Sequence, residues 1–347
     1  MSPPGLRDLL RMEVPLIDLR TPAEFSRGAF PRASNLPLLT DEERAAVGTT
    51  YKRRGQKAAI ALGERLVSGD IRVRRVQAWL AFATEHPNAW LYCWRGGMRS
   101  ATVQSWLHDA GMDLPRVEGG YKRLRALCIN TLEAAADDQQ RPWLMLGGRT
   151  GTGKTEVLTS QQAGIDLEGL ANHRGSAFGA RDAPQPTPIA FENALAADYL
   201  RHRTLSVLLE DESRAIGRVG IPGSWFARMQ RSPVVILEAS LEERGQRIAA
   251  EYVREPMRTG KTPQELEFTL RESLGRISRR LGGRRHKLID TALSNAFAHG
   301  DHTTWITMLL KWYYDPMYDY QLRKKKERIV FSGSRPDVIG YLENWTR

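Results

Sequence analysis

Short apolar runs recur along the chain, separated by longer segments in which apolar residues return every three or four positions. The apolar runs are residues 14–19, 89–92, 143–146, 206–209 and 234–237. Each run is short enough for a buried strand, whereas residues 60–85 and 100–110 have the spacing of helices. Residues 116–118 are a further candidate strand, closed by two glycines. This alternation predicts an α/β fold with a mostly parallel sheet.

A polar run at residues 137–141 interrupts this pattern. We interpret it as a linker, because 347 residues are enough for about two hydrophobic cores. The final residues, 271–347, are helical by pattern and rich in cations. We therefore predict one domain at 1–136 and a second at 142–270, with 271–347 as a basic helical region that packs on the second domain.

Composition narrows the class of protein. No apolar run reaches about 18 residues, so no membrane-spanning helix is expected, and residues 1–8 lack the apolar centre of a signal peptide. Only two cysteines occur, Cys93 and Cys128, which favours a reducing cytoplasm over a disulfide-linked protein. The net charge of +11 favours a polyanionic partner, with nucleic acid ahead of an acidic membrane surface. We expect a cytoplasmic monomer.

The clearest motif is residues 148–155, which match G-x-x-x-x-G-K-[ST] directly after an apolar run. Glycines allow a tight loop whose N–H groups enclose a phosphate group, and the lysine adds positive charge. An ordinary glycine turn before a helix is the structural alternative. The motif predicts a polyphosphate or diphosphate site formed by Gly148, Gly151, Thr152, Gly153, Lys154 and Thr155.

Acidic residues follow the apolar run at 206–209. Magnesium is usually bound by one or two carboxylates together with phosphate oxygens. We predict Asp211 and Thr155 as magnesium ligands, with Glu210 and Glu212 as alternatives to Asp211. A solvated loop end is the structural alternative.

Cys93 follows the apolar run at 89–92 and precedes two glycines and a helical pattern. Loop N–H groups and nearby arginines stabilise a thiolate, which is a nucleophile, and such a loop can also hold an anion. We predict Cys93 as the catalytic residue and Arg95, Gly96, Gly97 and Arg99 as its anion loop. A buried core cysteine is the alternative, and we assign that role to Cys128.

The first domain resembles rhodanese-like domains. Its Asp18-Leu19-Arg20, Glu24-Phe25, Gly28 and Asn35-Leu36-Pro37 match their N-terminal signature, and Cys93 falls at their sulfur-accepting cysteine. Ala29 stands where that family often has histidine. The resemblance implies that Cys93 accepts sulfur or selenium.

The combination of a rhodanese-like domain with a P-loop NTPase-like domain indicates a family more specifically than either domain alone. Residues 14–345 resemble the tRNA 2-selenouridine synthase family in this combination and in four segments: Tyr92–Ser100, Ala171–Gly179, Glu210–Ser213 and Tyr313–Tyr318. The resemblance implies exchange of sulfur for selenium in the wobble 2-thiouridine of tRNA, with selenophosphate as donor. It also implies an S-geranyl intermediate made from geranyl diphosphate. Whether the P-loop also binds a nucleotide is left open.

The basic helical region supplies candidate tRNA contacts, because phosphate neutralisation dominates binding to nucleic acid. The predicted contacts are Arg276, Arg279, Arg280, Arg284, Arg285 and Lys287. Trp305, Trp312, Tyr313 and Tyr314 are either core residues or a platform for an anticodon base. His173 and Arg174 are either phosphate contacts or structural.

Three other functions fit parts of the sequence. A P-loop ATPase or kinase would need only Lys154 and its loop. The spacing Cys93-x5-Arg99 also occurs in cysteine-dependent phosphatases. A nucleotide-switched RNA-binding protein would use the P-loop and the cations without covalent chemistry.

Overall fold

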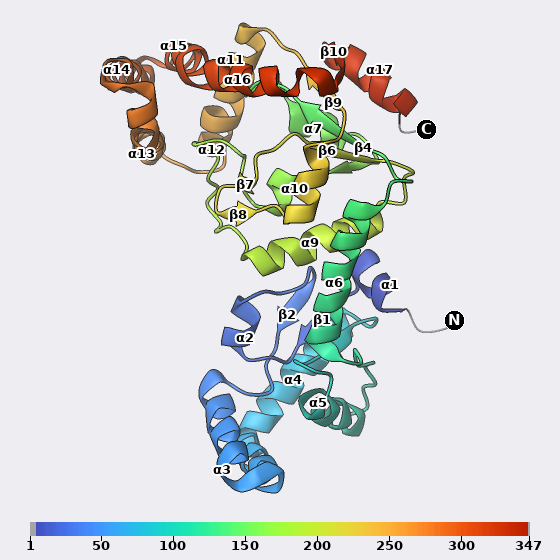
Figure 1. Ribbon diagram of the computed structural model, residues 1–347. Helices are drawn as coiled ribbons and strands as arrows, with labels where there is room; N and C mark the ends of the chain where they lie inside the picture. Colours follow the sequence, from blue (N-terminus) through green and yellow to red (C-terminus); the bar gives the residue numbers. More distant parts are fainter. Residues whose placement is uncertain (1–4, 346–347) are drawn as a thin grey trace. The chain divides into compact units, whose positions relative to one another are not determined.

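The computed structural model describes residues 5–345, which form two compact units (Figure 1). Unit 1 contains the chain up to Ala135 together with Pro186–Arg201. Unit 2 contains Ala136–Gln185 and the chain from His202 onward. The predicted outer segments also included residues 1–4 and 346–347, which lie outside the described part.

Unit 1 is built on a parallel sheet with strand order β2-β1-β3. Its strands are β1 (Leu16–Asp18), β2 (Ala33–Asn35) and β3 (Trp90–Tyr92). Its helices are α1 (Leu6–Arg11), α2 (Pro22–Ser26), α3 (Asp41–Leu66), α4 (Gly69–Glu85), α5 (Met98–Asp109), α6 (Gly120–Asp137) and α9 (Pro188–Arg201). The apolar runs at 14–19 and 89–92 thus form neighbouring strands, as their composition predicts. The candidate strand at 116–118 contributes a single bridge, from Arg116 to Leu91.

Two parts of unit 1 differ from the sequence-based picture. The predicted linker at 137–141 begins inside α6, because buried Leu132, Ala135 and Ala136 continue the helical pattern. Helix α9 belongs to unit 1, although it lies within the predicted second domain. The side chain of Asn193 donates to the carbonyl of Ala29 at 2.9 Å, and no local sequence pattern predicts this contact.

Unit 2 contains a five-stranded sheet with strand order β10-β9-β4-β6-β5, in which all pairs are parallel. Its strands are β4 (Trp143–Gly147), β5 (Gly164–Ile165), β6 (Val207–Glu210), β9 (Val234–Leu237) and β10 (Ile329–Gly333). A separate antiparallel pair consists of β7 (Ala215–Ile216) and β8 (Val219–Gly220). The apolar runs at 143–146, 206–209 and 234–237 form the buried central strands, so the α/β prediction is confirmed.

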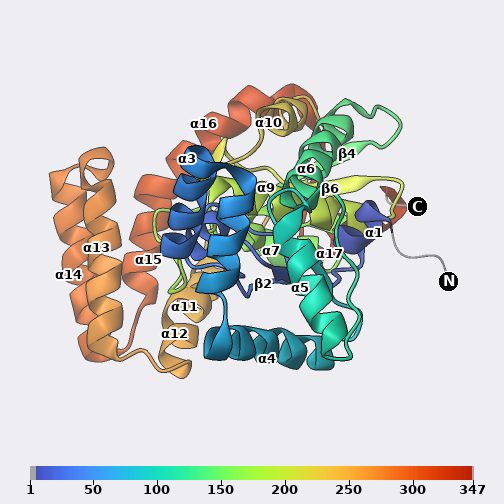
Figure 2. The same cartoon turned by 90° about the horizontal axis from the view of Figure 1, so that it is seen from below.

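The helices of unit 2 flank this sheet or follow it. They are α7 (Lys154–Thr159), α8 (Leu167–Leu170), α10 (Gly223–Met229), α11 (Leu241–Ala249), η1 (Ala250–Arg254), α12 (Glu255–Arg258), α13 (Pro263–Leu281), α14 (Gly283–His299), α15 (Thr303–Leu309), η2 (Leu310–Tyr314), α16 (Asp315–Lys325), η3 (Lys326–Arg328) and α17 (Arg335–Trp345). Helices α13 and α14 lie side by side (Figure 2). Their inward faces share a core with α15 and η2.

The pattern of the C-terminal region predicted helices throughout, but the region also contains a strand. Strand β10 pairs with β9 at the edge of the sheet, and α17 packs on the same sheet through Val338 and Leu342. In the described part of the chain, no helix is both long enough and apolar enough to span a lipid bilayer.

Candidate functional site

The cysteine loop of unit 1 connects β3 to α5. Cys93 directly follows β3, and Gly97 is the residue before the first turn of α5. The thiol of Cys93 lies 3.4 Å from the hydroxyl of Ser100, and the residue is only 3% exposed. Burial raises the pKa of Cys128 to about 12, and this second cysteine is a core residue, as predicted.

The start of α6 holds this loop in place. Tyr121 donates its backbone N–H to the carbonyl of Cys93 at 2.9 Å. A Cβ atom on Gly120 would lie 2.2 Å from that carbonyl oxygen and 2.4 Å from the nitrogen of Gly96. No side chain fits there, so glycine at position 120 allows the loop and the helix to approach each other closely.

The four predicted anion-loop residues do not all face one ligand. Gly96 and Gly97 lie in the loop, and Arg95 is exposed beside it. The guanidinium of Arg99 instead contacts the carboxylate of Glu24 at 2.6 Å. Burial opposes ionisation of Glu24, but the hydrogen bond and charge of Arg99 prevail and lower its pKa. Arg99 therefore links the loop to α2 and is not free to enclose an anion.

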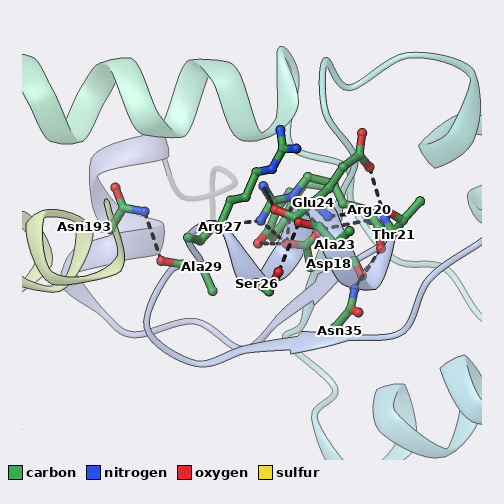
Figure 3. Close-up of polar contacts among 12 residues, drawn as sticks. Asp18, Arg20, Thr21, Ala23, Glu24, Ser26, Arg27, Ala29, Asn35 and Asn193 are labelled. Atoms are coloured by element: carbon green, nitrogen blue, oxygen red, sulfur yellow. Dashed lines mark hydrogen bonds and ion pairs between the residues drawn. The ribbon is translucent and has the colours of Figure 1, made fainter. Parts of the chain in front are cut away.

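A buried ion pair joins Arg20 to Asp18 at the end of β1 (Figure 3). Arg20 contacts Asp18 at 2.6 Å, and both side chains are fully buried. Tyr92 donates its hydroxyl to the same carboxylate at 2.6 Å. The guanidinium of Arg20 lies 3.7 Å from the ring centre of Tyr121, which stacks on Trp94. Arg20 is thus connected through Tyr121 to Trp94, the residue that follows Cys93.

Breaking this pair should destabilise unit 1 strongly. We expect Arg20→Met to lower the free energy of unfolding by about 3–5 kcal/mol, because the carboxylate of Asp18 stays buried without its partner. Urea denaturation followed by circular dichroism measures the change. The matched control is Arg11→Met, which removes the surface pair with Asp8 and should cost about 0–1 kcal/mol. Equal midpoints for the two variants would contradict this account.

In unit 2 the phosphate loop connects β4 to α7. Gly151 and Gly153 have φ of 83° and 85°, values that L side chains rarely adopt, which is why the motif places glycine there. Lys154 reaches back across the loop, and its ammonium donates to the carbonyl of Gly148 at 2.9 Å. Thr152 is buried and donates to the carbonyl of Arg149. The predicted diphosphate-binding residues therefore lie together.

Two arginines of α11 donate hydrogen bonds to carbonyl groups of this loop. Arg244 is buried, donates to the carbonyl of Thr150 at 2.9 Å and pairs with Asp315 at 2.5 Å. Arg247 donates to the carbonyl of Gly151 at 2.8 Å. The sequence patterns did not predict a role for Arg244, Arg247 or Asp315. The only local signal is two arginines three positions apart on a helix, which is common on solvent-facing helices.

The acidic partner of the phosphate loop is Glu210, rather than the predicted Asp211. Glu210 is fully buried and accepts a hydrogen bond from the hydroxyl of Thr155 at 2.8 Å. Its second oxygen has no hydrogen-bond partner. Asp211 instead forms an ion pair with Lys325 at 2.6 Å. Asp211 nevertheless lines the cavity at the phosphate loop together with Lys154 and Thr155.

Carboxyl groups are concentrated around Lys154. Burial, together with the nearby charges of Glu210 and Glu212, raises the pKa of Glu168 well above its usual range. Burial and the charges of Glu212 and Asp166 likewise raise the pKa of Glu210. Lys154 opposes both shifts. Bound cations would favour the ionised forms of these groups.

The donor set at Thr155 and Glu210 fits magnesium that is shared with a phosphate ligand. Among residues 5–345, no group of three or more His, Cys, Asp or Glu side chains is arranged to hold a metal by itself. Glu210 offers one carboxylate oxygen without a partner, and Thr155 offers a hydroxyl. A protein usually contributes such a small number of oxygen ligands to magnesium when phosphate oxygens complete the coordination.

A cavity of about 820 Å³ opens in front of the phosphate loop. Lys154, Glu168, Arg174 and Arg280 line it. Arg174 also pairs with Glu251 at 2.7 Å. The ring of His173 accepts a hydrogen bond from the backbone of Gly175, and its backbone donates to the carbonyl of Glu168, which supports its structural interpretation.

The six predicted tRNA contacts on α13 and α14 are all exposed. Arg280 links this surface to the cavity of the phosphate loop. By contrast, Trp305, Tyr313 and Tyr314 are core residues, each less than a tenth exposed. The stacking alternative is therefore wrong for these three aromatic residues, and partly buried Trp312 packs against the same core.

Residues 141–347 match the tRNA 2-selenouridine synthase AAA domain. A tRNA 2-selenouridine synthase of Cupriavidus necator is 49% identical, over 98% of this chain and 97% of its own length. One of Azotobacter vinelandii is 49% identical, over 95% and 94%. One of Pseudomonas syringae pv. tomato is 48% identical, over 97% and 96%. With similarity of this extent over both units, the chain belongs to the tRNA 2-selenouridine synthase family.

Proposed function

We propose that this protein converts the wobble 2-thiouridine of tRNA to 2-selenouridine, through an S-geranyl intermediate, with geranyl diphosphate and selenophosphate as co-substrates. One observation carries the proposal. A chain 49% identical to a named 2-selenouridine synthase holds both a cysteine loop and a phosphate loop with a buried acidic partner. Unit 1 would be the rhodanese-like domain, and the enzyme would act as a cytoplasmic monomer.

The phosphate loop would perform the alkylation step. The base sulfur attacks the first carbon of the geranyl chain while the C–O bond to the diphosphate breaks. The diphosphate leaves with that electron pair, and the base releases its N3 proton to solvent. Loop N–H groups and Lys154, which lies across the loop, would stabilise the negative charge on this leaving group. Thr155 and Glu210 would hold a magnesium ion, which adds further charge neutralisation when bound.

The cysteine loop would perform the exchange step. Selenium of selenophosphate bonds to C2 of the base while the C2–S bond breaks, and the alkylthiolate leaves with the electron pair and takes up a proton. Water then cleaves the Se–P bond and releases phosphate. Cys93 would deliver the donor, with N–H groups of Gly96 and Gly97 and the exposed guanidinium of Arg95 on its phosphate part. Arg99 would position the loop through Glu24.

Helices α13 and α14 would contact the tRNA backbone. We expect the triple variant Arg276→Ala, Arg284→Ala, Lys287→Ala to bind tRNA more weakly than the wild type. A plot of log affinity against log salt should become less steep by about 3, which corresponds to three lost phosphate contacts. Filter binding at several salt concentrations measures the slope. A triple alanine variant of Arg203, Arg218 and Arg231, which are exposed outside these helices, is the control. Equal slopes in both variants would contradict the assignment.

The proposed function is tested with the purified protein and tRNA that carries 2-thiouridine. Addition of geranyl diphosphate should yield S-geranyl-2-thiouridine, and further addition of selenophosphate should yield 2-selenouridine, both detected by mass spectrometry of nucleosides. Unchanged tRNA would contradict the proposal. ATP hydrolysis alone, or phosphate release from a monoester without RNA, would support the kinase or phosphatase alternative instead.

A further inference from the structure

Unit 1 contains a cavity of about 1140 Å³ that the cysteine chemistry does not explain. Its wall is formed by α3, α4 and α5 together with Leu38 and Leu39. Selenophosphate is far smaller than this space, since even drug-sized ligands bind in pockets of roughly 300–1,000 Å³. The cavity therefore has room for a larger part of a substrate.

The cavity is maintained by the shape of α3. This helix folds back at Gly55, where φ is 80°, so that its two arms lie side by side (Figure 2). The arms are close enough that a Cβ on Gly63 would lie 3.9 Å from Val47. Arg75 of α4 pairs with Glu43 at 2.9 Å and also donates to the carbonyl of Leu38. The walls are thus tied together by contacts that remain without any occupant.

The cavity is lined by both apolar and charged side chains. Val47, Ala59, Ile60 and Trp106 are among the apolar ones. Four cations outside the Arg99–Glu24 pair also line it, namely Arg44, Lys52, Arg72 and Arg95, against the single carboxylate of Glu64. Such a site fits a ligand with an apolar chain that remains attached to a large polyanion.

The cavity adjoins the cysteine loop. Arg95, Met98 and Arg99, which follow Cys93 in the chain, line it together with Thr102 of α5. The amide of Gln56 in α3 lies 3.6 Å from the sulfur of Met98. A group held here is therefore next to the loop that, in the proposed function, handles selenium.

We infer that this cavity, which we call the α3–α5 groove, receives the geranyl chain of the S-alkylated wobble base of tRNA. This inference rests on the proposed function and deepens it. The alkylated base has an apolar chain that 2-thiouridine lacks, and the tRNA backbone supplies anions for the distributed cations. A free diphosphate needs one compact cradle, and the phosphate loop of unit 2 already offers it.

The groove would act as a selector between the two steps. It binds the alkylated base beside the cysteine loop, and the alkylthiol leaves into the same apolar space after selenium has replaced sulfur. Unmodified 2-thiouridine would gain nothing from the groove, so it would not occupy the exchange site. The order of alkylation followed by exchange would then follow from apolar burial of the geranyl chain.

The test compares two anticodon stem-loop RNAs that differ only in S-geranyl-2-thiouridine or 2-thiouridine at the wobble position. We expect the full chain to bind the geranylated RNA at least about tenfold more tightly, because apolar fit in a pocket is worth factors of this size. Ile60→Trp and Thr102→Phe, which fill the groove from two different helices, should remove this preference. Ala61→Trp, on the exposed face beside Ile60, should retain it.

The filled variants should still alkylate 2-thiouridine tRNA with geranyl diphosphate, and they should accumulate the S-geranyl product. Urea denaturation followed by circular dichroism, with a midpoint close to that of the wild type, shows that their unit 1 still folds. The inference is overturned if both variants keep the preference or convert the geranylated RNA at the normal rate. It is also overturned if free geranyl diphosphate displaces the geranylated RNA from the wild type but not from Ile60→Trp, since the donor would then be the occupant. If the wild type neither forms nor converts S-geranyl RNA, the proposed function itself fails.

Discussion

Replacing Cys93 by alanine should abolish the formation of 2-selenouridine while S-geranyl-2-thiouridine accumulates. The variant removes the thiol from the loop between β3 and α5 and leaves the phosphate loop of unit 2 intact. Because Cys93 would deliver the selenium donor to the base, its loss should block the exchange step and leave alkylation unaffected. Mass spectrometry of nucleosides from tRNA, after reaction with geranyl diphosphate and selenophosphate, measures both products.

Cys128→Ala is the matched control for this variant. Its thiol is fully buried in α6, and burial raises its pKa to about 12, so it should contribute nothing to selenium transfer. A Cys93→Ala protein that still makes 2-selenouridine at the normal level would show that the thiol is structural. The substitution removes only the sulfur atom, and the loop is also held by Tyr121 and Gly120, so the change in packing should be small.

Replacing Lys154 by alanine should block the reaction one step earlier. The ammonium of Lys154 lies over the phosphate loop, and without it the leaving diphosphate loses its mobile positive charge. Removal of one such electrostatic contact typically costs about 10²–10³ in rate. We therefore expect neither S-geranyl-2-thiouridine nor 2-selenouridine from 2-thiouridine tRNA, as measured by the same nucleoside analysis.

Supplying RNA that already carries the geranyl group separates the two sites. Lys154→Ala should convert this RNA to 2-selenouridine, whereas Cys93→Ala should not. Lys261→Ala is the control, because that lysine pairs with Asp182 at the surface and does not line the cavity of the phosphate loop. Failure of Lys154→Ala to use the geranylated RNA would mean that the phosphate loop also serves selenium transfer.

The central strands could be predicted because their residues are apolar on both faces. Residues 143–146, 206–209 and 234–237 need no information about neighbours to be recognised as buried strands. Strand β10 could not be recognised in this way, because its side chains alternate between half-buried and exposed. Its pairing with β9 joins segments about 90 residues apart, and the cationic helical pattern before it suggested more helix.

Helix α9 illustrates the same limit on domain boundaries. Its sequence lies between strands of unit 2, and its pattern is that of an ordinary amphipathic helix. Its place in unit 1 depends on polar contacts such as Asn193 to Ala29 and Arg125 to Glu192. Such contacts become visible only once distant segments are brought together.

The sequence alone determined the positions of the phosphate loop and the cysteine loop, because both depend on local backbone chemistry: glycines where φ is positive, and a functional side chain directly after a strand. The tertiary structure alone decided which side chains serve them. Strand pairing places Glu210 rather than Asp211 against Thr155, and packing of α2 diverts Arg99 to Glu24. The reason is that side-chain direction and burial are set by neighbours across the fold, which spacing along the chain does not encode.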